Sequence, residues 1–203
     1  MIPQNYPAAA RAFAGLVRTI PESRWSSPGL GEWDVRALVG HTSRALATVV
    51  GYLPMMASRE DVGSPWQYYA EFRTGRFATD PAAIVERGRQ AGAALGENPA
   101  DTVDALVEEV LGRLDVVTGD PLIAVIGGLG IRLSTYLATR TFELAVHSLD
   151  IAAATEIVFA LPDEVLEETT QLAMRIACTL GDGAMVLHAL TGRRRLPESF
   201  SIV

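Results

Sequence analysis

The chain has 203 residues, of which 49% are hydrophobic and 20% charged, a composition typical of a folded globular protein with a sizeable core. Its net charge is −7 and all 17 basic residues are arginine, so no lysine-rich stripe is present to neutralise phosphates, and nucleic acid is not an expected partner. With one cysteine, no recognisable signal sequence and no apolar run long enough to cross a membrane, the sequence predicts a single cytoplasmic domain without membrane contact.

Helical periodicity predicts the first two helices. Apolar residues recur at helical spacing from Tyr6 to Ile20, and Pro21 ends this segment because proline lacks the amide donor. Asp34 can accept hydrogen bonds from the free amides that open a helix. We therefore expect a second helix from there to about Leu53.

The middle of the chain is predicted to contain a loop and a divided helical segment. Residues 63–75 are expected to form an irregular connection that contains aromatic side chains. Asp80 followed by Pro81 is the pattern of an N-cap and a first-turn proline, which predicts a helix over residues 81–95. Asn98 and Pro99 break the pattern, and helical spacing resumes over residues 101–114, as one broken helix or two short ones.

The remaining segments are predicted to be mostly helical. Residues 116–131 are rich in Val and Ile and are expected to form a loop with a short extended piece. Ser134 is a predicted N-cap for a long helix that reaches about Thr155. A further helix is expected from Pro162 and Asp163 to Gly181, and a short one over residues 184–190 precedes the tail.

These elements predict an all-α fold. We expect a metal-binding four-helix bundle over residues 1–156, with a C-terminal helical extension and tail over residues 157–203. An α/β fold is the alternative, but it needs several strands where at most one is recognised. Cys178 is interpreted as a buried packing residue of the extension.

Five side chains share one face of the helix predicted after Ser134. They are spaced by four, three, four and three residues: Tyr136, Arg140, Glu143, His147 and Asp150. The helix is otherwise apolar on more than one side, which predicts burial, and buried charges are costly unless compensated. Glu143 and His147 present an oxygen and a nitrogen from adjacent turns, as metal ligation requires. The alternative is a solvated face with ordinary ion pairs.

His41 is the candidate third ligand. It lies at the edge of the apolar stripe of the second predicted helix and should point inward. A lone inward histidine is often a satisfied core residue, but a facing helix that also offers inward ligands favours a metal site. We therefore predict that His41, Glu143 and His147 bind one divalent metal ion.

Three segments resemble a known family. They are Trp25 with PGLGEWDVRALVGH at residues 28–41, TRTFELAVHSLDI at residues 139–151, and LTGRRRLPESF at residues 190–200. In these the sequence resembles the DinB-like superfamily and, within it, the mycothiol-dependent maleylpyruvate isomerase family. The resemblance implies a four-helix bundle, zinc held by His41, Glu143 and His147, and the thiol cofactor mycothiol. The segment after the metal helix is shorter than in the family's isomerases, so the resemblance does not identify a substrate.

The leading hypothesis for function is a metal-dependent reaction of a low-molecular-weight thiol. Two histidines and one glutamate leave a zinc coordination position open, and a coordinated thiol loses its proton near neutral pH. The thiolate would add to a small electrophilic substrate, giving S-transfer or cis–trans isomerisation. Asp150 would fix the tautomer of His147, and Arg140 would orient Glu143 or bind a substrate carboxylate. Helix-surface ion pairs are the alternative for both.

Two residues near the C-terminus are weaker candidates. Arg193, in the run Arg193 to Arg195, could clamp an anionic substrate, although a solvated tail is the simpler interpretation. His188 could be a fourth ligand or a structural histidine. A second class of hypothesis is a non-catalytic metal-binding bundle that binds a small ligand or a partner protein, and a homodimer is also left open.

Overall fold

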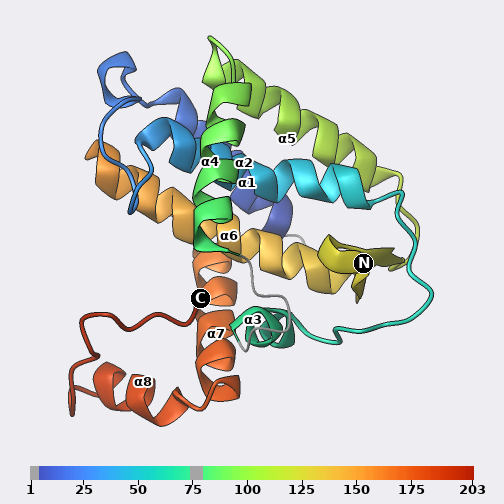
Figure 1. Ribbon diagram of the computed structural model, residues 1–203, viewed down its shortest axis with the longest axis vertical. Helices are drawn as coiled ribbons and strands as arrows, with labels where there is room; N and C mark the ends of the chain where they lie inside the picture. Colours follow the sequence, from blue (N-terminus) through green and yellow to red (C-terminus); the bar gives the residue numbers. More distant parts are fainter. Residues whose placement is uncertain (1–4, 74–79) are drawn as a thin grey trace.

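Helices account for most of the structure, a computed structural model that describes residues 5–73 and 80–203. Within those residues the helices are α1 (Asn5–Arg18), α2 (Val35–Tyr52), α3 (Pro65–Arg73), α4 (Pro81–Ala94), α5 (Pro99–Asp115), α6 (Leu133–Thr155), α7 (Asp163–Thr179) and α8 (Gly183–Leu190) (Figure 1). Strands β1 (Leu122–Ala124) and β2 (Gly130–Arg132) form an antiparallel hairpin between α5 and α6. The prediction of an all-α fold is confirmed.

Four helices form the central bundle. Both α1 and α2 pack against α5 and α6, so each helix of one pair contacts both helices of the other. Apolar side chains at helical spacing fill the space between them, as the periodicity predicts. Fully buried examples are Phe13 on α1, Leu38 and Leu46 on α2, Val110 on α5 and Leu144 on α6. The inward face of α6, where the candidate ligands lie, is therefore turned toward α2.

Helix α4 packs on the outside of α2 at a very short distance. A Cβ atom added to Gly40 would lie 2.1 Å from the backbone nitrogen of Gly92, so the two backbones touch where neither residue has a side chain. Figure 1 shows α4 crossing α2 near the middle of the bundle. Because His41 follows Gly40, this crossing brings α4 beside a candidate ligand.

Two of the three predicted N-caps are confirmed. The carboxylate of Asp34 accepts a hydrogen bond from the Ala37 amide at 2.7 Å, and that of Asp80 accepts one from the Ala82 amide at 3.0 Å. The Ser134 prediction is wrong, because α6 begins at Leu133 and Asp120 performs the capping. Its carboxylate accepts hydrogen bonds from the Ser134 amide at 2.8 Å and the Ser134 hydroxyl at 2.7 Å.

The predicted irregular connection over residues 63–75 is also wrong for most of its length. Residues 65–73 form α3, which packs against α6 and α7, while residues 74 and 75 lie outside the described part of the chain. The side chain of Ser64 accepts a hydrogen bond from the Gln67 amide at 3.3 Å and so caps this helix. Asn98 and Pro99 separate two independent helices, α4 and α5.

The C-terminal helices begin and end close to their predicted positions. Gly181 has a φ of 89°, which ends the α7 region in the left-handed conformation that favours glycine. In Figure 1, α8 lies at the opposite end of the molecule from α5, and the tail returns so that the chain ends beside α7. The interpretation of Cys178 as a buried residue is wrong, because its side chain is exposed. Among the described helices, none is both long and apolar enough to cross a membrane.

Candidate metal centre

The structure brings together the three predicted ligands. Glu143 and His147 lie one turn apart on α6, and the packing of α2 against α6 adds His41. One ligand atom from each side chain lies within 4.8 Å of the others, close enough for one ion to contact all three. In the described part of the chain, no other group of three His, Cys, Asp or Glu residues has this spacing.

His147 is held between two carboxylates. Its Nδ1 lies 3.0 Å from Asp150 Oδ2, and its Nε2 lies 3.4 Å from Glu143 Oε2. When Asp150 accepts the Nδ1 proton, Nε2 is the nitrogen that faces the other ligands. Burial lowers the pKa of His147, but the hydrogen bonds to Asp150 and Glu143 outweigh it and raise the pKa to about 9. Without a metal, the imidazole of His147 is therefore protonated at neutral pH.

Glu143 receives a hydrogen bond from outside its own helix. The Tyr69 hydroxyl, on α3, lies 2.9 Å from Glu143 Oε1 and 3.0 Å from the Thr139 carbonyl, and its single proton can be donated to one of them at a time. Burial would raise the pKa of Glu143, but the hydrogen bond from His147 and the charge of Arg140 lower it to about 2. The carboxylate is therefore charged and available as a ligand.

Tyr69 was missed by the sequence analysis because it lies in the segment predicted to be irregular. The missed signal is Ser64 followed by Pro65, which has the N-cap and first-turn proline pattern used correctly at Asp80. That pattern could have predicted α3. It could not have predicted that Tyr69 reaches Glu143, since this depends on how α3 packs against α6.

Arg140 is enclosed by aromatic rings next to Glu143. Its guanidinium carbon lies 4.9 Å from the Tyr136 ring centroid and 5.6 Å from that of Tyr68, within the range of cation–π contacts. Its Nε donates to Thr139 Oγ1 at 3.1 Å, and a terminal nitrogen lies 4.0 Å from Glu143 Oε1. That separation is an ion pair without a hydrogen bond. The terminal N–H groups can therefore donate to another acceptor.

His41 differs from the other two ligands because it lacks a polar partner. Its Nδ1 is buried and has no hydrogen-bond partner among the described residues. Burial and the charge of His147 lower the pKa of His41 to about 4, so the ring is neutral at neutral pH. His41 thus offers a neutral imidazole with a buried nitrogen that has no other partner, beside the imidazole of His147 and the carboxylate of Glu143. These donors fit a divalent ion such as zinc.

Of the two C-terminal candidates, His188 lies outside the ligand group, and the hydrogen bond of the Arg193 guanidinium is made within the tail. Arg193 is exposed, and its guanidinium donates to the Thr191 carbonyl at 2.8 Å. His188 is exposed on α8. Both residues lie in the extension beyond α7, and neither belongs to the group of three ligands.

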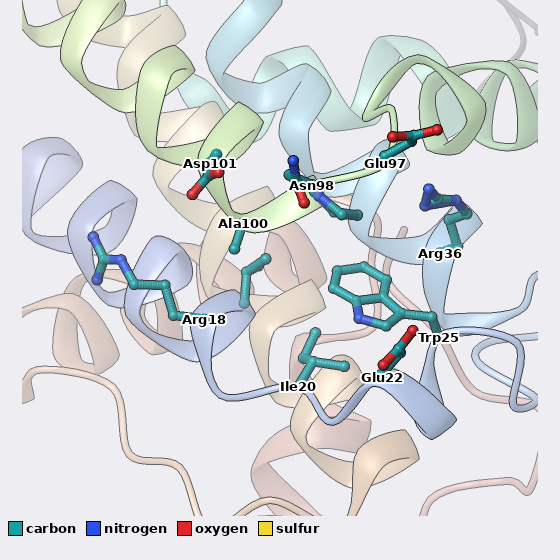
Figure 2. A pocket seen from close by; sticks show the side chains of 11 residues that line it. Arg18, Ile20, Glu22, Trp25, Arg36, Glu97, Asn98, Ala100 and Asp101 are labelled. Atoms are coloured by element: carbon teal, nitrogen blue, oxygen red, sulfur yellow. The ribbon is translucent and has the colours of Figure 1, made fainter.

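A cavity of about 540 Å³ lies elsewhere, between the end of α1, the start of α2 and the connection from α4 to α5 (Figure 2). Trp25 and Arg36 are among its lining residues. Arg18, at its edge, forms an ion pair with Asp104 at 2.7 Å, so its charge is already compensated. None of the three candidate ligands lines this cavity, and it is separate from the metal centre.

The fold and the cluster define a helical bundle with a candidate His-His-Glu metal centre. The family model described as "Mycothiol maleylpyruvate isomerase N-terminal domain" matches residues 6–152, and the chain belongs to this family. The resemblance stated from the sequence motifs is thereby confirmed. The matched region contains all three candidate ligands and ends before α7. No curated protein and no solved structure matches the chain.

Proposed function

We propose that this protein is a metal-dependent enzyme that uses a low-molecular-weight thiol, mycothiol, for S-transfer to, or cis–trans isomerisation of, a small electrophilic substrate. The observation that carries the proposal is the convergence of His41, Glu143 and His147 within 4.8 Å in a member of a family named for a mycothiol-dependent isomerase. A zinc ion held there would supply a Lewis acid that lowers the pKa of a thiol in its remaining coordination position.

The surrounding residues prepare the ligands for a metal. Asp150 holds the Nδ1 side of His147 and directs Nε2 to the cluster, and Tyr69 restrains one oxygen of Glu143. The side chains of His147 and Glu143 are 15% and 24% exposed, so the candidate ligands are shielded but not fully enclosed. In the described part of the chain the one cysteine is exposed Cys178, outside this cluster, which favours an external thiol as the nucleophile.

Arg140 supports the view that the substrate carries a negative charge. Its side chain is 12% exposed, and its terminal nitrogens make no hydrogen bond to the described residues, although Glu143 Oε1 lies 4.0 Å away. A buried cation with free donors beside a reaction centre suits a carboxylate, which it can bind through two parallel hydrogen bonds. Arg140 would then orient the substrate and also keep Glu143 charged.

The test is a turnover assay with zinc-loaded protein, using maleylpyruvate as the first electrophile and mycothiol as the thiol. We expect conversion only when metal and thiol are both present, with loss in a His147→Ala variant and retention in the matched variant His188→Ala. Conversion without any added thiol would contradict the proposal, and its persistence in a Cys178→Ser variant would indicate water as the nucleophile. Full zinc occupancy without turnover of any electrophile would instead favour a non-catalytic metal-binding bundle.

A further inference from the structure

Trp33 lies directly against the ring of His41. The two ring centroids are 4.4 Å apart, and the planes are inclined by 31°, a tilted and partly stacked arrangement. Trp33 precedes α2, whereas His41 lies within that helix. The rings of His41 and His147 form a T-shaped pair, with centroids 5.0 Å apart and planes at 85°. The imidazole of His41 is therefore in contact with two other rings.

Helix α4 fixes the orientation of Trp33. The indole Nε1 donates a hydrogen bond to the Val85 carbonyl at 2.9 Å. A Cβ atom added to Gly88 would lie 2.5 Å from the indole atoms Cε2 and Nε1, so the ring fits only because residue 88 has no side chain. The indole is thus held on one side by α4 and presents a face to His41.

His41 lacks the hydrogen bond that usually orients a metal-binding histidine. Such a ring typically donates its second N–H to a carboxylate or a carbonyl, and His147 has this partner in Asp150 at 3.0 Å. The buried Nδ1 of His41 has no hydrogen-bond partner in the described part of the chain, and no hydrogen bond to its Nε2 is formed there either, so whichever nitrogen binds the ion leaves the other without such a partner. The ring contacts with Trp33 and His147 are then the interactions that restrict the rotation of His41.

We propose that Trp33 is a positioning residue of the metal centre. By stacking on His41 it sets the plane of the imidazole, and so replaces the hydrogen-bonded carboxylate that His147 has in Asp150. Val85 and Gly88 support this role, because the Val85 carbonyl binds the indole N–H and Gly88 leaves room for the ring. This inference rests on the proposed metal site but assigns a role outside the three ligands.

The experiment measures Zn²⁺ affinity of the full chain by competition with a chromophoric chelator, and the visible spectrum of bound Co²⁺. Trp33→Ala should lower the Zn²⁺ affinity by about 10- to 100-fold, the loss typical when a ligand's supporting partner is removed, and should alter the Co²⁺ bands. Trp33→Phe keeps an aromatic face but loses the hydrogen bond to Val85 and part of the ring area, so its affinity should fall less than that of Trp33→Ala. Gly88→Ala should also lower the affinity, because it displaces the indole without removing it.

Trp25→Ala is the matched control, since Trp25 is another tryptophan near the start of α2. The guanidinium carbon of Arg36 lies 6.0 Å from its ring centroid. We expect it to leave affinity and Co²⁺ spectrum unchanged while circular dichroism shows all variants folded. Equal losses in Trp33→Ala and Trp25→Ala, or no loss in either, would overturn the positioning role.

A measurement on metal-free protein separates this inference from the proposed function. The chain has three histidines, so the ring protons of His41 can be assigned by NMR with single-histidine variants. Stacking on an indole shifts these protons upfield, and the shift should disappear in Trp33→Ala. A His41 spectrum that is identical in wild type and Trp33→Ala contradicts the stacking role. Wild-type protein that binds no Zn²⁺ but shows the upfield shift contradicts only the metal site.

Discussion

On α6 the histidine, arginine and carboxylate side chains contact one another, whereas in the C-terminal extension the same residue types face solvent. His147 is 15% exposed and lies within 3.4 Å of Asp150 and Glu143. His188 is exposed on α8, and exposed Arg193 donates to a carbonyl two residues away. The difference shows that residue type alone does not distinguish the candidate site on α6. The candidate site is distinguished by burial of charged groups that compensate one another, because burying a charge costs free energy unless a partner is present.

The largest expected effect comes from removing a ligand on α6. His147→Ala should lower Zn²⁺ affinity by more than the 10- to 100-fold typical of supporting residues, here about 1000-fold or more. The bundle should remain folded, because His147 lies at the edge of a core built from other residues of α6. The measurement is chelator competition together with thermal unfolding. An equal loss of Zn²⁺ affinity in His188→Ala would contradict the distinction between α6 and the C-terminal extension, since His188 is exposed.

The second effect is a pH dependence of metal binding that arises from His147. Its pKa of about 9 means that Zn²⁺ must displace a proton below that pH, whereas His41, with a pKa of about 4, is already neutral. Affinity should therefore rise by about tenfold per pH unit from pH 6 to pH 8, with release of about one proton per ion. Isothermal titration calorimetry in buffers of different ionisation enthalpy measures that proton.

Asp150→Asn sharpens the same prediction. The hydrogen bond to Asp150 raises the pKa of His147, so its loss should lower that pKa and make the affinity level off at a lower pH. An unchanged pH profile in this variant would show that Asp150 does not act through His147. A slope of two protons per ion in the wild type would show that His41 is also protonated, contrary to its buried and unpartnered environment.

A smaller effect is expected at Tyr69, which supports Glu143 from α3. Tyr69→Phe removes the hydroxyl that lies 2.9 Å from Glu143 Oε1. It keeps the ring, whose centroid lies 5.2 Å from that of Phe142. We expect a loss of roughly 1–2 kcal/mol in the free energy of unfolding, because a buried charged acceptor loses a donor. The Zn²⁺ affinity should fall by about tenfold. Tyr52→Phe is the matched control, because the ring of Tyr52 contacts Tyr136 and, among the described residues, no hydrogen bond joins it to Glu143.

Local pattern predicted the bundle well because helix formation and burial follow periodicity along the chain. Helices α1, α2, α5, α6 and α7 lie close to their expected positions, and the three-four-three spacing on α6 identified residues that the structure brings together. The errors concern groups whose partners are distant in sequence. Asp120 caps α6 in place of Ser134, and the Tyr69 contact to Glu143 joins α3 to α6.

The environment of His41 shows the same limit. Its inward position followed from the apolar stripe on α2, and the structure places it with Glu143 and His147. Its contact with Trp33 could not be read from the sequence, because the indole is held by α4 at Val85 and fits only beside Gly88. Periodicity predicts which way a side chain points, whereas the neighbour that orients it depends on packing between helices.

The smallest effect is expected at Cys178, the chain's single cysteine, which is exposed at the end of α7. If an external thiol is the nucleophile, Cys178→Ser should leave Zn²⁺ affinity, stability and thiol-dependent turnover unchanged, since an exposed residue outside the cluster contributes little to any of them. The informative comparison is turnover of both proteins with and without added mycothiol. Wild-type turnover without added thiol that disappears in Cys178→Ser would show that the protein supplies its own nucleophile from the C-terminal extension. The contrast between α6 and that extension would then no longer separate functional residues from solvated ones.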